Sequence, residues 1–148
     1  MPASTNSFPG LVAQLFYGAS TASLNSLVAV STAPASLRNS TSASAGTWFN
    51  FGSRTLTGFN PGDTVNLQVR VWDISKGTDF CAAIADPNYG TPLGNFYGYS
   101  AIFSYTVPTN PTPVPSEFNM NNFQGFSVNF WIDPFFCVTR CPNPVRSP

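Results

Sequence analysis

The sequence predicts an all-β fold, a single antiparallel β-sandwich that is Ig-like or jelly-roll-like, with about seven to eight short strands and little helix. Short apolar or alternating segments recur along the chain, and turn-forming residues separate them about every ten positions. Charged residues make up only 8% of the sequence, against about 25% in typical soluble domains. Because Lys and Glu are good helix formers, this composition also favours strands over helices.

The first half of the chain is expected to contain four strands. Residues 10–17, GLVAQLFY, form a strand candidate closed by a glycine, and 24–30 form a second. A polar, low-complexity loop at 36–46 precedes a short aromatic strand at 47–51, and 54–58 is a possible fourth strand.

The strongest strand prediction is 63–73, DTVNLQVRVWD, which follows a turn at 60–63 of sequence NPGD. In that turn proline presets its φ angle and glycine supplies a left-handed position. Strict alternation places Leu67, Val69 and Val71 on one face, which we expect to be core. The other face, made by Gln68, Arg70 and Trp72, is expected to be a packed outer surface.

The second half is expected to contain one or two helical turns at 78–85, a strand at 99–107 and a last strand at 123–131. The last strand places Phe126, Val128 and Phe130 on one side. Between these two strands the Pro-rich connector 108–116 is expected to be a polyproline-like spacer.

The chain of 148 residues fits one domain. We expect a disordered or truncated lead at 1–9, the sandwich domain at 10–131 and an irregular tail at 132–148. No apolar run approaches the length of a membrane span. The start, MPASTNSFPG, lacks the pattern of a signal peptide, which taken literally indicates a cytoplasmic chain or else a truncated start.

The charge pattern limits the expected partners. Six basic and six acidic residues balance to zero, and the basic ones are scattered along the chain. Nucleic acid is therefore not expected as a partner, because binding the phosphate backbone needs clustered cations. A neutral surface carries little self-repulsion, so self-association is a possible partnership.

Few arrangements of catalytic residues are open to this chain. It has no histidine, which excludes Ser-His-Asp and Cys-His catalysis and the usual zinc sites, and it has no phosphate-binding glycine loop. We expect no catalytic residues, no metal and no cofactor. Two of the acidic residues could meet in space as a hydrolytic pair, but solvated turn residues are the simpler interpretation. These residues are Asp63, Asp73, Asp79, Asp86, Glu117 and Asp133. The segment 73–79 resembles a calcium loop faintly, and a turn capped by Asp is the simpler interpretation.

Aromatic residues are the main candidates for a binding site. Tyr and Trp favour positions where one edge of the ring is wet, so they could form a platform for sugar rings or simply cap the open ends of the sandwich. The candidate ligand-binding residues are Trp48, Arg70, Trp72, Tyr89, Tyr97 and Tyr99.

Three cysteines, Cys81, Cys137 and Cys141, permit at most one disulfide. Two interpretations stay open: unpaired or opportunistically paired thiols, or one bridge in an exported protein.

Several segments together carry a resemblance over about residues 10–130. They are LVAQLFYG at 11–18, SLVAV at 26–30, RTLTG at 54–58, LQVRVWD at 67–73, FCAA at 80–83, YSAIF at 99–103 and QGFSV at 124–128. The sequence resembles a group of uncharacterised exported β-sandwich proteins of Verrucomicrobia-like bacteria, many of which end in a PEP-CTERM sorting tail that this chain lacks. The resemblance implies an extracellular or cell-surface location and no established activity.

These observations favour a non-catalytic structural or adhesive module of the cell surface or extracellular matrix. The alternatives are a carbohydrate-binding module that uses exposed Trp and Tyr on a surface polysaccharide, and a fragment of a carbohydrate-active enzyme.

Overall fold

The computed structural model describes residues 10–30, 33–38, 43, 47–49, 54–85, 96–109 and 120–128. The described strands form one antiparallel sheet of six strands, with little helix, so the all-β prediction is confirmed. The sheet path is β2-β1-β4-β5, while β3 also pairs with β1 and β6 with β4. Within these residues, no helix has the length and apolar character needed to cross a membrane.

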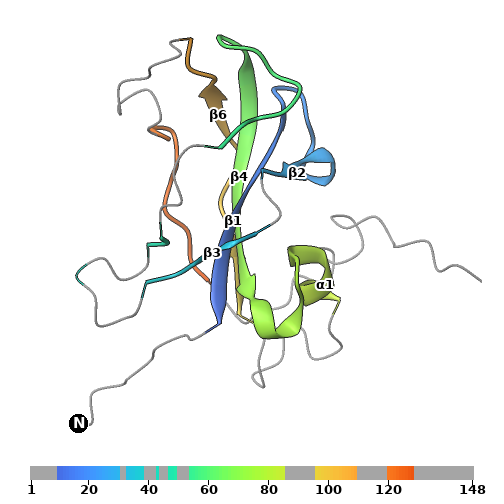
Figure 1. The fold of residues 1–148 in the computed structure, drawn as a ribbon, viewed down its shortest axis with the longest axis vertical. Helices are drawn as coiled ribbons and strands as arrows, with labels where there is room; N and C mark the ends of the chain where they lie inside the picture. Colours follow the sequence, from blue (N-terminus) through green and yellow to red (C-terminus); the bar gives the residue numbers. More distant parts are fainter. Residues whose placement is uncertain are drawn as a thin grey trace, which may run out of the picture.

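Two long strands form the centre of the sheet. β1 (Leu11–Ala19) and β4 (Thr64–Asp73) pair over nine residues, from Leu11 opposite Asp73 to Ala19 opposite Val65. Figure 1 shows them side by side through the middle of the molecule. Both strands are buried on both faces for most of their length, as expected for strands covered from two sides.

Shorter strands flank this pair. β2 (Val28–Ala29) and β3 (Ala35–Ser36) line the free edge of β1 at different heights. β5 (Tyr97–Tyr99) and β6 (Phe103–Thr106) line the free edge of β4 in the same way.

The two faces of the sheet have different cores. We call the face with Val12, Phe16 and Trp72 the arginine face, because Arg70 lies on it; α1 (Phe80–Ile84) and Leu27 cover it. We call the opposite face the strap face and define the strap as residues 120–128. The sheet residues of the strap face are Leu11, Ala13, Tyr17, Val65, Leu67, Val69, Val71 and Phe103.

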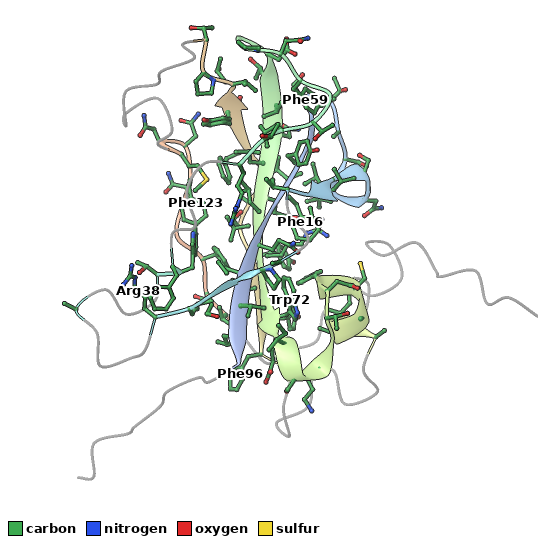
Figure 2. The ribbon with its side chains drawn as sticks, viewed as in Figure 1. Phe16, Arg38, Phe59, Trp72, Phe96 and Phe123 are labelled. Carbon is green, nitrogen blue, oxygen red and sulfur yellow. The ribbon has the colours of Figure 1, made fainter. Side chains whose placement is uncertain are left out.

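In Figure 1 the strap, drawn in orange, and α1 lie on opposite sides of the central strands. Figure 2 shows Trp72 and Phe16 pointing to the side of α1 and Phe123 lying on the side of the strap. The predicted core residues Leu67, Val69 and Val71 are confirmed, with at most 2% of each exposed.

The turn before β4 is confirmed. Gly62 has a φ of +90°, which glycine adopts without strain. The Asp63 carboxylate accepts a hydrogen bond of 2.7 Å from the Asn60 backbone N–H, and the Asp63 N–H donates to the Asn60 carbonyl. The loop therefore closes on itself just before the strand begins.

Five strand predictions need correction. Residues 54–58 contain a turn and no strand, with Gly58 at a φ of +88°. The segment 24–30 begins with the 3-10 helix η1 (Leu24–Ser26), where the Ser26 hydroxyl donates to the Ser23 carbonyl, and only Val28 and Ala29 are in a strand. In 47–49 one residue, Trp48, forms a single bridge with Leu37.

The fourth correction concerns the last predicted strand. Residues 123–128 pack Phe126 and Val128 against the sheet as predicted, but they have no strand structure. Phe130 and the rest of the prediction to 131 lie outside the described residues, as do most of the connector 108–116, the lead 1–9 and the tail 132–148.

The predicted strand 99–107 is interrupted in the middle. β5 ends at Tyr99, and β6 begins at Phe103. At the interruption the Ser100 hydroxyl oxygen accepts a hydrogen bond from the Val69 N–H at 3.0 Å, in the place of a backbone carbonyl. The Ser100 N–H donates to the Val69 carbonyl, so both backbone groups of Val69 are satisfied by one residue.

The helical prediction for 78–85 is confirmed by α1. The Asp79 carboxylate accepts from the Ala82 N–H at 2.9 Å and caps the N-terminus of this short helix. Gly77 makes the close packing possible, because a Cβ atom there would lie 2.3 Å from the Ala83 nitrogen. The helix can therefore fold back onto the preceding turn, η2 (Ile74–Lys76), and cover Trp72.

Candidate functional site

Four of the predicted binding residues, Arg70, Trp72, Tyr97 and Tyr99, lie together on the arginine face. Trp72 is opposite Tyr97 in the register of β4 and β5, and Arg70 is opposite Tyr99. Trp48 lies on the strap face instead, and Tyr89 is outside the described residues.

Arg70 is the most unusual member of this cluster, because its side chain is only 2% exposed. Its Nε donates to the Gln68 Oε1 atom at 2.9 Å, and its Nη2 donates to the Leu24 carbonyl at 2.9 Å. The guanidinium also lies over two rings, 4.1 Å from the centroid of Phe16 and 5.2 Å from that of Phe80. Charge-assisted hydrogen bonds and cation–π contacts both compensate for the loss of water around the cation.

The hydrogen bonds continue from Arg70 to the interruption between β5 and β6. Gln68 is fully buried, and its Nε2 donates to the Ser100 carbonyl at 2.9 Å. The Ser100 hydroxyl in turn donates to the Ala101 carbonyl at 2.7 Å. The network thus joins η1, β4 and the β5–β6 segment by hydrogen bonds between side chains and backbone.

Trp72 is 1% exposed and lies in the same buried cluster as Phe16 and Phe80. Its indole N–H donates to the Gly77 carbonyl at 3.0 Å, and its ring meets Phe80 edge to face at 6.0 Å. The buried indole thus has both a polar partner and an aromatic partner.

The buried rings present no open face for the sugar platform, which was one of the two interpretations of the aromatic residues. Trp72 and Tyr97 are 1% and 7% exposed, and Tyr99 is half-buried against the same core cluster. Trp48 is half-buried and packs edge to face on Phe123, with ring centroids 5.9 Å apart. A sugar needs an open ring face for stacking, and α1 and the strap cover these positions.

One exposed aromatic contact was missed by the sequence reasoning. Phe49 is 45% exposed, and the Arg38 guanidinium lies 4.6 Å from its ring centroid. Phe49 follows Trp48, so strand alternation could have placed one ring inward and the other outward.

The acidic residues in the described part act locally. Asp63 closes its turn, Asp73 accepts from the Ser75 N–H at 2.9 Å, and Asp79 caps α1. The interpretation of 73–79 as a turn capped by Asp is confirmed. No group of three or more His, Cys, Asp or Glu side chains suited to a metal occurs among the residues described. Asp86, Glu117 and Asp133 lie outside them.

Cys81, in α1, is disulfide-bonded. The two other cysteines of the chain, Cys137 and Cys141, lie outside the described residues. Of the two interpretations that the sequence left open, the structure therefore favours a bridge that involves Cys81.

Comparisons with known proteins give no further guide to this site. No protein-family model matches the chain, and no curated protein and no solved structure matches it. The interpretation of the arginine face therefore depends on its chemistry, which is that of a satisfied, buried structural network.

Proposed function

We propose that this chain is a non-catalytic structural or adhesive module, exported to the cell surface or extracellular matrix. The observation that carries this proposal is that, in the described part of the chain, most of the candidate binding and acidic side chains serve packing or local capping. Arg70 and Trp72 are buried, and Asp73 and Asp79 cap local backbone. A protein that performed catalysis or bound sugar would need some of these groups to face a substrate.

The disulfide of Cys81 supports export. Disulfides form and persist in oxidising compartments and are rare in the cytosol, where thiols are kept reduced. The location implied by the family resemblance agrees with this chemistry.

We also infer that the architecture is sandwich-like. The strap face is covered by a second layer that includes Leu37, Trp48, Phe123 and Phe126. Phe123 contacts Trp48 beyond one edge of the sheet and Phe103 on β6, at the other edge, with centroid distances of 5.9 and 5.5 Å. A second layer over one face of the sheet supports this inference, because a sandwich packs two layers around one core.

The experiment that tests the location combines cell fractionation with thiol counting. We would tag the native gene product, label intact cells with a membrane-impermeant reagent and alkylate the extracted protein before and after reduction. We expect surface labelling and a rise from one alkylated cysteine to all three. Recovery from the cytosol with three free thiols would overturn the proposal.

Two assays test the proposal that the chain neither binds nor cleaves sugar. A glycan array measures binding, and incubation with a panel of polysaccharides measures the release of reducing sugar. We expect neither retention nor turnover. Retention that the substitution Phe49→Ala abolishes would replace the proposal by a carbohydrate-binding module, and turnover would replace it by an enzyme fragment.

A further inference from the structure

Cys81 lies on α1, and the packing of α1 against the sheet fixes its position. The helix buries Phe80 and Ile84, which are 1% and 2% exposed, in the core of the arginine face. The Phe80 ring meets the rings of Phe16 and Trp72 edge to face, with centroid distances of 6.5 and 6.0 Å. The buried area and the aromatic pairs both stabilise the helix in this position. The Cys81 sulfur is therefore carried by a well-anchored part of the molecule.

The Cys81 side chain lies at the border of this packed face. Three residues of α1 are buried, namely Phe80, Ala83 and Ile84, whereas Cys81 is half-buried and its neighbour Ala82 is exposed. Attack on a disulfide needs access to one of its sulfur atoms. The disulfide of Cys81 therefore lies outside the core, where a thiolate can approach it.

The number of cysteines determines what remains beside this disulfide. Cys81 is disulfide-bonded, and the chain contains two other cysteines, Cys137 and Cys141. One of these two is therefore the partner of Cys81, and the other is left over as a thiol. The observed disulfide thus implies a thiol four residues along the chain from the bonded partner.

The short spacing keeps this thiol near the disulfide and makes the two possible partners almost equivalent. Four residues span at most about 14 Å even when the chain is fully extended. The loops closed by a disulfide from Cys81 to Cys137 or to Cys141 differ by only four residues. Because the entropy of loop closure depends on the logarithm of loop length, it favours neither partner.

We propose that Cys81 is the fixed member of an exchangeable disulfide, and that its partner alternates between Cys137 and Cys141. The thiolate of the leftover cysteine attacks the Cys81 sulfur, and the earlier partner leaves as a thiolate. One S–S bond forms as the other breaks, and the departing thiolate takes up the proton that the attacking thiol lost. The step therefore needs no oxidant and no reductant. It goes beyond a structural or adhesive role, because it gives the chain a reactive site that such a role does not require.

Arg140 lies between the two cysteines and makes peptide mapping a direct test. The folded chain is alkylated with N-ethylmaleimide in mild acid and digested with trypsin without reduction. Cleavage leaves Cys81 and Cys137 in the peptide 77–140 and Cys141 in the peptide 141–146, CPNPVR. By mass spectrometry we expect the second peptide both alkylated and linked to the first, in a ratio of less than about tenfold. A single form would overturn the proposal.

Cys137→Ser and Cys141→Ser are matched variants, since each removes one partner and leaves the other. We expect both variants to keep Cys81 in a disulfide and to contain no cysteine that maleimide can alkylate. A free Cys81 thiol in either variant would contradict the proposal, because only one of the two cysteines would then serve as its partner.

Separation of the two disulfide isomers of the unchanged chain shows whether they interconvert. The isomers are separated by chromatography in acid, where exchange stops because the thiols are protonated, and each is returned to mildly alkaline buffer. We expect both to relax to the same mixture within minutes to hours. An isomer whose thiol is alkylated beforehand should stay as it was isolated. If isomers with free thiols also persisted unchanged, exchange would be wrong, whereas the proposed function would stand, since a fixed disulfide equally supports export.

Discussion

From Leu67 to Trp72 the two faces of β4 are equally buried, but they are built in different ways. The strap face presents Val65, Leu67, Val69 and Val71, all aliphatic. The arginine face presents Gln68, Arg70 and Trp72, which combine polar groups with a large aromatic ring. One strand therefore supplies a purely apolar core on one side and a hydrogen-bonded core on the other.

This difference affects how strictly each face determines the segment that packs on it. An aliphatic surface accepts any apolar segment of suitable volume, because the hydrophobic effect has no direction. A buried network accepts one arrangement, because each unsatisfied donor or acceptor costs about 1–3 kcal/mol. We therefore expect the arginine face to fix the position of α1 and η1, and the strap face to tolerate apolar substitutions in the residues that cover it.

The largest expected effect compares two neighbours on β4. Trp72→Ala removes a fully buried ring and the hydrogen bond to the Gly77 carbonyl, and we expect it to lower the free energy of unfolding by about 4 kcal/mol. Val71→Ala removes two methyl groups from the strap face, and we expect a loss of about 2 kcal/mol. Urea unfolding followed by circular dichroism measures both, and equal losses would contradict the contrast between the faces.

Substitutions of Arg70 test whether the volume of its side chain or its hydrogen bonds stabilise the arginine face. Arg70→Ala leaves the Gln68 Oε1 and the Leu24 carbonyl without this donor and opens a cavity, so we expect a loss of about 3 kcal/mol. Arg70→Met keeps most of the stem volume and should cost about 1 kcal/mol less than alanine. The same denaturant titration separates them. If methionine proved as costly as alanine, packing by the stem would not contribute.

Phe123→Ala tests the packing of the strap face by changing the strap that covers it. The ring contacts Trp48, Phe103 and Phe126 but is only half-buried, so we expect a loss of about 2 kcal/mol. Phe49→Ala is the matched control, since 45% of Phe49 is exposed and its loss should stay within about 0.5 kcal/mol. Thermal unfolding in which both variants lost the same stability would contradict the packing of the strap.

The smallest expected effect concerns the cap of the helix that covers the arginine face. Asp79→Ala removes the acceptor for the Ala82 N–H and should cost about 1 kcal/mol. Asp79→Asn keeps an acceptor and should cost only a few tenths of that amount. Near-ultraviolet circular dichroism reports on the packing of Trp72, and unchanged unfolding of the alanine variant would show that the cap is dispensable.

The strand prediction succeeded where alternation was strict and failed where local chemistry competed. β1 and β4 follow from their own sequences, as does the turn before β4. The prediction failed at 24–30, where serine hydroxyls bond to nearby backbone, and at 99–107, where Ser100 replaces a backbone acceptor. Side-chain bonds of this kind depend on a partner that periodicity does not reveal.

The candidate site shows the same limit. Arg70, Trp72 and Tyr97 could be recognised as unusual residues, and the alternation of β4 placed the first two on one face. Their burial could not be predicted, because it depends on α1 and on Leu27, which lie on separate segments of the chain.

The sequence by itself determined the all-β character, the two-sided pattern of β4, the turn at 60–63 and a turn capped by Asp within 73–79. These features depend on residues a few positions apart, where steric preference and backbone hydrogen bonding act directly. Only the tertiary structure decided that both faces of β4 are covered, that Phe80 of α1 packs on Arg70 and that the strap packs against the aliphatic cluster of the other face. Contacts between distant segments decide these outcomes, because the burial of a side chain depends on which distant segment packs over it.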